Sequence, residues 1–283
     1  IIGSLSGPSL PAADDLLLRA LLAESLGDDE VLGVKVRALL DRGAVHAAYS
    51  LLGQSQINSL ESFALFAEAA LLTDNVERMC SQLNAARHLS NDEALQVYCH
   101  ARAGSWDTAV LNYFTLDTLR AFSPTTSALL AANLDPELAD ILSLPRADPL
   151  SLSALEFKLR ASVGQPLATQ TLPLKFTPSD LGATTSWKQQ IESAERLGAI
   201  GSLPAAQLLE RYKSNQPSAS GGVWDRVLAV QNLDNALGDH IIDPSDELLE
   251  FWTLMRNRKL AAPLARAWAK KLVKFEKALE SNS

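Results

Sequence analysis

Cys80 and Cys99 are the two residues of this 283-residue chain whose side chains most directly suggest covalent chemistry. Two thiols are too few for a four-ligand zinc site or for a disulfide-stapled miniprotein. In the helical arrangement inferred below, they lie on neighbouring packed helices, where a disulfide can form if the Cα atoms come within about 7 Å. The sequence therefore leaves two interpretations, a disulfide, which implies an oxidising compartment, or two ordinary buried thiols.

The four histidines are scattered along the chain at His46, His88, His100 and His240, and none has the spacing of a metal-binding pair. Cys99 and His100 are adjacent, but neighbouring residues of a helix point about 100° apart, which argues against a thiolate–imidazole pair. No Gly-x-Ser-x-Gly nucleophile motif occurs. We predict no catalytic residue, no metal ligand and no cofactor.

Carboxylates are the remaining candidates for catalysis, because all-helical superhelices also serve glycan-cleaving enzymes. That chemistry needs one or two carboxylates in a cleft, at least one with a raised pKa. Glu192, Glu195 and Glu210 lie on predicted polar helix faces beside Lys or Arg, which is typical of solvated ion pairs. A glycan-acting (cell-wall) enzyme, or the superhelical accessory domain of one, is therefore the alternative function.

Gly221 and Gly222 precede a predicted helix, where free amides and the helix dipole could hold an anion. Asp225 in the first turn would repel such an anion. We therefore favour a simple helix start with Ser220 as its cap.

Composition predicts an all-α protein whose main partner is not a nucleic acid. Leu and Ala dominate the 47% of apolar residues, and Val and Ile rarely alternate with polar residues. The net charge of −8 disfavours nucleic acid. No apolar run is long enough for a transmembrane segment. Because the chain begins with Ile, we expect that its amino end has been removed, and we favour an exported, periplasm-like location over the cytoplasm.

Three turn residues, Gly43, Asp74 and Gly104, are spaced 31 and 30 residues apart and indicate an internal repeat. Apolar residues recur at matched positions after each turn, namely Val45, Val76 and Trp106, and then Ala48, Met79 and Ala109. Their steps of three and four residues predict a helix, a tight turn and a second helix in each unit. We expect Trp106 to pack between helices.

Two helix starts are predicted from the spacing of a capping box. Asn58 and Glu61 have this spacing before one apolar run, and Ser90 and Glu93 have it before the next.

Gly104, Trp106, Ala109 and Val110 resemble the turn within tetratricopeptide-type repeats, and Gly43 begins a weaker copy. The resemblance covers roughly residues 28–120. The family period is about 34 residues, and the shorter units here favour a divergent repeat or a general α-solenoid. The resemblance implies a concave groove for a protein or peptide. We predict a non-catalytic scaffold or assembly factor, with a structural subunit of a larger complex as a third interpretation.

Pro166, Pro173 and Pro178 predict an irregular crossing between two helical regions, residues 1–165 and 166–283, which could also form one superhelical domain. A last amphipathic helix is predicted over about residues 258–280. Its basic face contains Arg266, Lys270, Lys271 and Lys274. This face could contact an acidic partner or a membrane surface, but we favour the interpretation that the helix closes the helical stack.

Overall fold

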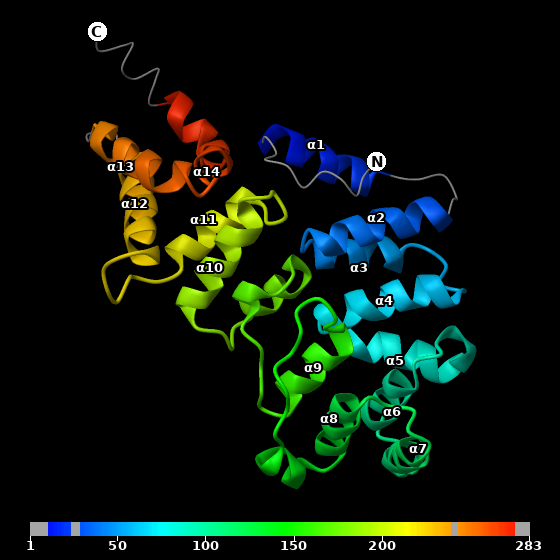
Figure 1. Ribbon diagram of the computed structural model, residues 1–283. Coiled ribbons are helices and arrows are strands. Elements are labelled where there is room, and N and C mark those ends of the chain that lie inside the picture. The colour runs from blue at the N-terminus through cyan, green and yellow to red at the C-terminus, as the bar shows by residue number, and fades with distance from the viewer. Residues whose placement is uncertain (1–10, 24–28, 239–242, 275–283) are drawn as a thin grey trace. The chain divides into compact units, whose positions relative to one another are not determined.

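The structure, a computed structural model, describes residues 11–23, 29–238 and 243–274 and is entirely helical there, with no strand in these ranges (Figure 1). The all-α prediction is confirmed. The α-helices are α1 (Pro11–Leu22), α2 (Asp29–Asp41), α3 (Val45–Gly53), α4 (Leu60–Leu72), α5 (Val76–Ala85), α6 (Glu93–Arg102), α7 (Trp106–Thr118), α8 (Pro124–Leu134), α9 (Ala154–Ser162), α10 (Trp187–Gly198), α11 (Ala205–Lys213), α12 (Val223–Ala236), α13 (Ser245–Arg256) and α14 (Ala261–Ala267). The 3-10 helices are η2 (Arg87–Leu89), η3 (Pro136–Ile141), η4 (Thr169–Thr171) and η5 (Leu174–Leu181). No described helix is long and apolar enough to cross a membrane.

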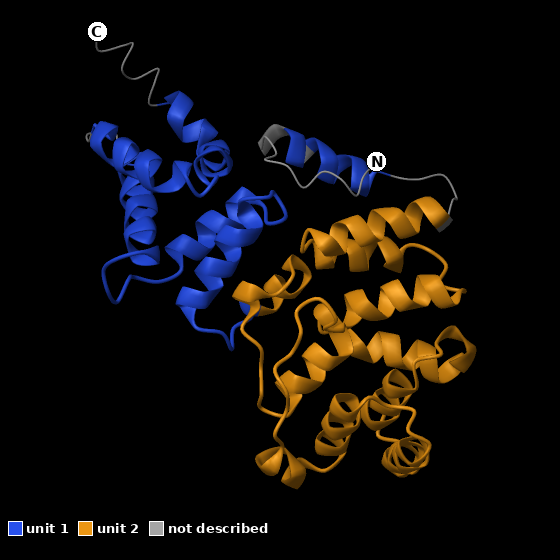
Figure 2. Ribbon diagram, in the orientation of Figure 1, with its two compact units in different colours: residues 1–23, 180–283 blue, residues 24–179 orange. Residues whose placement is uncertain are grey.

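The chain divides into two compact units, which Figure 2 shows in two colours. Unit 2 is residues 24–179, and unit 1 combines residues 1–23 with residues 180–283. The predicted domains, 1–165 and 166–283, stay a prediction.

Unit 2 begins with three helical hairpins, α2–α3, α4–α5 and α6–α7, in which each helix packs on the next. Gly43, Asp74 and Gly104 lie at the three hairpin turns with φ of 72°, 59° and 76°. The residue after each of them donates its backbone N–H to the carbonyl five residues earlier, at 2.9–3.0 Å. This hydrogen bond is typical of the Schellman motif at a helix C-terminus, in which the turn residue itself adopts a left-handed backbone conformation. Asp is among the few residues with a Cβ that tolerate it.

Helices α8 and α9 return along the first helices of the hairpins, where α8 contacts α6 and α9 contacts α4. Lys158 of α9 forms an ion pair with Asp74, and Lys175 pairs with Glu68 of α4 at 2.7 Å. The Pro-rich segment adds Phe176, which is fully buried and packs on Phe157 with 4.8 Å between ring centroids. The side of the hairpins that was predicted to form a groove is therefore partly covered by the chain itself.

Unit 1 packs α10–α14 around a core that includes Tyr212, Phe251 and Trp268. The single helix predicted over residues 258–280 is wrong. Lys259, with φ of 61°, ends the preceding helix, and a turn at Trp268 separates α14 from the helical residues 269–274. Residues 275–280 of the prediction lie outside the described residues.

Candidate functional site

An apolar stripe of side chains faces outward on α7, the second helix of the third hairpin. Leu111 and Phe114 are 68% and 63% exposed, and Trp106 is 44% exposed. Val110 lies four residues from both Trp106 and Phe114, and Leu111 lies three residues before Phe114, so Phe114 links the four side chains along the helix surface. We call Trp106, Val110, Leu111 and Phe114 the α7 stripe.

The opposite side of α7 fixes the direction of this stripe. Ala109 and Tyr113 are buried, and the Tyr113 ring stacks on Phe122 at 6.2 Å between centroids. The Tyr113 hydroxyl lies 3.1 Å from Ser127 Oγ, a group that donates to Asp117. These contacts join α7 to α8 and leave the stripe without a covering element among the described residues. Trp106, at the first turn of α7, is 44% exposed and thus more than half covered, so its packing between helices stays a prediction.

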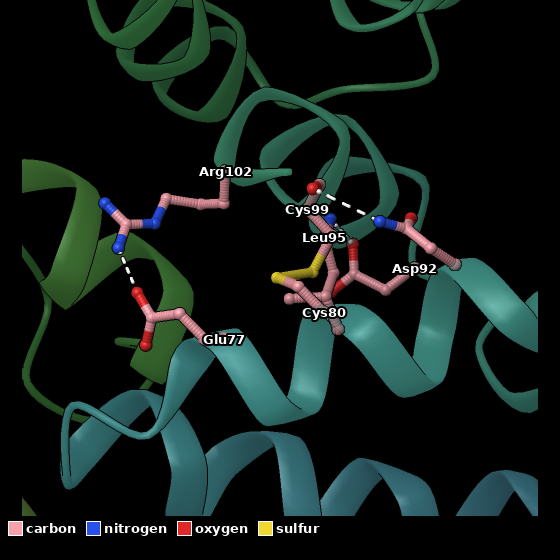
Figure 3. Close-up of a disulfide and its surroundings, with 7 residues drawn as sticks. Glu77, Cys80, Asp92, Leu95, Cys99 and Arg102 are labelled. Atoms are coloured by element: carbon pink, nitrogen blue, oxygen red, sulfur yellow. Dashed lines mark hydrogen bonds and ion pairs between the residues drawn. A yellow bond between two sulfur atoms is a disulfide. The ribbon is translucent and has the colours of Figure 1, made fainter. Parts of the chain in front are cut away.

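A disulfide between Cys80 and Cys99 holds the second hairpin to the third (Figure 3). Cys80 lies on α5 and Cys99 on α6, with Cα atoms 4.8 Å apart, and both residues are buried. An ion pair between Glu77 and Arg102 crosses between the same helices. Because α7 packs on α6, the bridge also fixes the helix that carries the α7 stripe.

His100 follows the bridge and is almost fully buried at 5% exposure. Arg87 Nη2 lies 3.3 Å from His100 Nε2, and a neutral imidazole accepts this bond. Burial, with the added repulsion of Arg87, lowers the pKa of His100 below 6.5. The imidazole is therefore a neutral part of the core.

This lowered pKa predicts a loss of stability in mild acid. The His100 imidazole binds a proton more tightly in the unfolded chain than in the folded one. Its contribution to the free energy of unfolding is therefore complete above pH 6.5 and falls as the pH drops toward the folded-state pKa. Urea unfolding at about pH 7.5 and pH 5 should show a smaller pH-dependent loss for His100→Gln than for the wild type. His88→Gln, at an exposed position, should match the wild type. Equal pH-dependent losses of stability in His100→Gln and the wild type would contradict the lowered pKa of His100.

Unit 1 contains a buried ion pair that the sequence did not reveal. Glu195 accepts two hydrogen bonds from Arg226, at 2.7 and 2.6 Å, and one from the Tyr212 hydroxyl at 2.8 Å. Burial lowers the pKa of Arg226, but the hydrogen bonds and charge of Glu195 more than offset this and raise it overall. Burial and Glu195 raise the pKa of Tyr212 well above 10.0.

Glu195 was predicted to be solvated, and that prediction is wrong because α11 and α12 supply the buried partners of this carboxylate. Glu192, in contrast, forms an exposed pair with Lys188, and Glu210 is exposed. The three hydrogen bonds of Glu195 therefore tie α10 to α11 and α12 inside unit 1.

Asp234 is a second buried carboxylate of unit 1, and it forms an ion pair with Lys271 of the predicted basic face. Lys213 and Lys271 lie 2.5 and 2.6 Å from its carboxylate oxygens, and the Trp268 indole donates to it at 2.8 Å. Burial alone would raise the pKa of Asp234, but these three donors lower it below 3.8. Lys271 thus ties the C-terminal helical segment to the core, whereas Lys270 and Lys274 are exposed.

Arg266 lines a pocket of about 200 Å³ in unit 1, together with the buried Asp14. Asp14 is the single carboxylate among the described residues that line this pocket. The paired carboxylates of a glycosidase are therefore not assembled there. The described residues contain no group of three or more His, Cys, Asp or Glu side chains that could hold a metal ion.

The Gly221–Gly222 start of α12 differs from its prediction. Ser220 does not cap the helix. Gly222 occupies the N-cap position without a side-chain bond, and both glycines have positive φ, 93° and 63°. Asp225 accepts the Gly221 N–H at 2.8 Å, and Arg226 donates to the Gly222 carbonyl at 2.9 Å. The loop is held by residues of the helix that follows it, and the carboxylate of Asp225 lies where an anion would have to bind.

Comparison of the chain with protein-family models, with curated proteins and with solved structures finds no match. The candidate site is therefore defined by geometry alone. The α7 stripe is one exposed apolar feature of the described surface, and α13 presents another with Leu248, Leu249 and Trp252.

Proposed function

We propose that this chain is a non-catalytic protein- or peptide-binding scaffold, and that the α7 stripe is its main contact surface. The observation that carries the proposal is the exposure of Leu111, Phe114 and Trp106 on one helix. In stacked helical repeats, the outer face of a terminal helix is usually polar, because solubility requires it. An outward apolar stripe on such a helix is typical of an interface.

The three hairpins themselves support a divergent tetratricopeptide-like α-solenoid. Their turns share one hydrogen-bonding pattern, and the spacing of the turns is nearly constant. Because α8 and α9 already contact the first helices of the hairpins, we place the partner on α7 rather than in a concave groove.

The partner that best suits this stripe is an apolar helix face or strand face of another protein. Trp and Phe side chains supply large rigid contact areas, and such residues dominate binding energy at interfaces. The buried disulfide supports an oxidising, exported location, because such bridges persist mainly there. The net charge of −8 supports a protein rather than a nucleic acid as partner.

Replacing both Leu111 and Phe114 by glutamine should strongly weaken partner binding while the fold persists. Each side chain contributes about 1.5–3 kcal/mol when it is fully buried in an interface, so the double variant should bind at least about tenfold more weakly. Both residues are exposed in the free chain, so the free energy of unfolding should change by less than about 1 kcal/mol. Affinity capture from native extract, quantified against the wild type, measures the loss.

The matched control changes Ser81 and Thr108 to glutamine, because both are exposed polar positions outside the stripe. This control should retain the partner at the wild-type level. Equal recovery of the same proteins by all three baits would contradict the proposed function.

A further inference from the structure

Helix α13 of unit 1 carries three exposed apolar side chains, which we call the α13 patch. Leu248, Leu249 and Trp252 are 41%, 67% and 46% exposed. Phe251 and Met255 form the inward side of the same helix and are buried in the core of unit 1. Because Leu248 and Leu249 lie four and three residues before Trp252, the three side chains are neighbours on the outward side of α13.

Positive charge begins where the α13 patch ends. Arg256 lies four residues after Trp252, so its side chain is a neighbour of the indole on the helix surface. Arg258 and Lys259 follow in the turn after α13. The acidic residues of α13 all precede Trp252, and none of them lies three or four residues from it. The α13 patch therefore has a cationic edge.

The excess of positive charge continues along the chain through α14, which packs on α13 (Figure 1). Residues 256–274 contain seven Lys or Arg residues and no Asp or Glu, although the net charge of the chain is −8. Lys271 pairs with Asp234. The other six are exposed and form no ion pair with any described residue, namely Arg256, Arg258, Lys259, Arg266, Lys270 and Lys274.

A partner of this surface must supply negative charge and must also cover apolar side chains. Cations at the end of α13 favour the helix dipole, but that effect does not account for the cations after α14 or for an exposed indole. A membrane with anionic lipids supplies both kinds of contact, because Lys and Arg bind its headgroups while Trp and Leu enter the boundary with the acyl chains. Lipid headgroups move laterally, so they can match cations that are spread over two helices better than carboxylates fixed on a folded protein can.

We propose that the α13 patch and its cationic edge bind the surface of a membrane that contains anionic lipids. Leu249 and Trp252 enter the interface, and Arg256 and Arg258 lie against the lipid phosphate groups. The remaining cations add an attraction that acts over about 10 Å at 0.1 M salt. This site does not depend on the proposed function of α7, because either surface can fail while the other stands.

Sedimentation of the full chain with lipid vesicles tests the proposal. The vesicles consist of phosphatidylcholine alone or of phosphatidylcholine with about 30% phosphatidylglycerol, which makes their surface negative. The protein should sediment with the anionic vesicles at about 0.1 M salt. Its binding should be at least about tenfold weaker with the neutral vesicles, and also with the anionic vesicles at about 0.5 M salt.

Two double variants separate the charged contacts from the apolar ones. Arg256→Gln with Arg258→Gln should weaken binding to anionic vesicles at least about tenfold, since each cation near such a surface contributes about fivefold. Leu249→Gln with Trp252→Gln should weaken vesicle binding by a similar factor of about ten. This second variant should bind soluble polyglutamate like the wild type, because all its cations remain.

The matched control is Arg120→Gln with Arg146→Gln, which removes the same charge from exposed positions of unit 2. It should bind anionic vesicles like the wild type. The arginine double variant serves as the test if the Leu249 and Trp252 variant does not fold. Equal binding to both kinds of vesicle, or an equal loss in the control, would overturn the proposal. Unchanged vesicle binding after the loss of Leu249 and Trp252 would also overturn it, in favour of an acidic soluble partner.

Discussion

Alanine in place of Glu195 is expected to lower the free energy of unfolding by about 3–5 kcal/mol. The substitution leaves the Arg226 guanidinium buried, at 7% exposure, without its carboxylate partner. It also removes the acceptor of the Tyr212 hydroxyl. A buried charge without a partner retains its full desolvation cost, which is why removing one member of such a pair is so destabilising.

Urea unfolding, followed by a probe in unit 1 such as Trp fluorescence, measures this effect. Glu192→Ala is the control, because the pair with Lys188 is long, at 3.9 Å, and solvent-exposed; its effect should be within about 0.5 kcal/mol. The double variant Glu195→Leu with Arg226→Met should recover much of the loss, since an apolar pair of similar volume pays no desolvation penalty. Similar effects of Glu195→Ala and Glu192→Ala would show that the ion pair is not buried in solution.

Removal of the disulfide should lower the stability of unit 2 by about 3 kcal/mol. The bridge closes a loop between residues 19 apart, and a loop of that size restricts the unfolded chain by about this free energy. Cys80→Ala with Cys99→Ala should reproduce the loss. The wild type should shift toward this variant when a reductant is added, and the variant itself should not respond to reductant.

A thiol titration of the denatured, unreduced protein completes this test. The bridge predicts no reactive thiol, whereas two reactive thiols would show that the cysteines are free. Glu77→Gln provides a surface control in the same region, since it removes the charge of the exposed pair with Arg102, and its effect should not depend on reductant.

The sequence predicted those parts of the fold that are set by nearby residues. Gly43 and Gly104 lie at helix ends because glycine readily adopts a positive φ. The apolar spacing that predicts the helices on either side also depends only on nearby residues. Arg120 and Lys259 adopt the same left-handed conformation at helix ends, but side chains of their kind give no such signal. Lys259 delays the start of α14 to Ala261, and the turn at Trp268 interrupts the long C-terminal helix that was predicted.

Helix starts were predicted to within one or two residues. Ser59, not Asn58, caps α4: its side chain accepts the Ser62 N–H, and Ser62 Oγ accepts the Ser59 N–H in return. Asp92, not Ser90, caps α6. At both helix starts, neighbouring polar residues are equally suitable as N-caps, and only the position of the helix axis decides which of them caps the helix.

Burial of Glu195 could not be predicted, because the carboxylate is 31 residues from Arg226 in sequence. A polar helix face next to Lys and Arg looks the same whether water or another helix covers it. The α7 stripe was missed for a related reason. Apolar residues surround much of α7, and the spacing alone does not show that Ala109 and Tyr113 face inward while Leu111 and Phe114 face out.

Site-specific photo-crosslinking in living cells is a direct test of whether the α7 stripe contacts another protein. A benzophenone amino acid is placed at Leu111 of α7 in one variant and at the exposed Ser81 of α5 in another. We expect a discrete crosslinked product with a second protein from position 111 and no such product from position 81. Absence of any product at position 111, or the same products from both positions, would contradict the assignment of the α7 stripe as a binding surface.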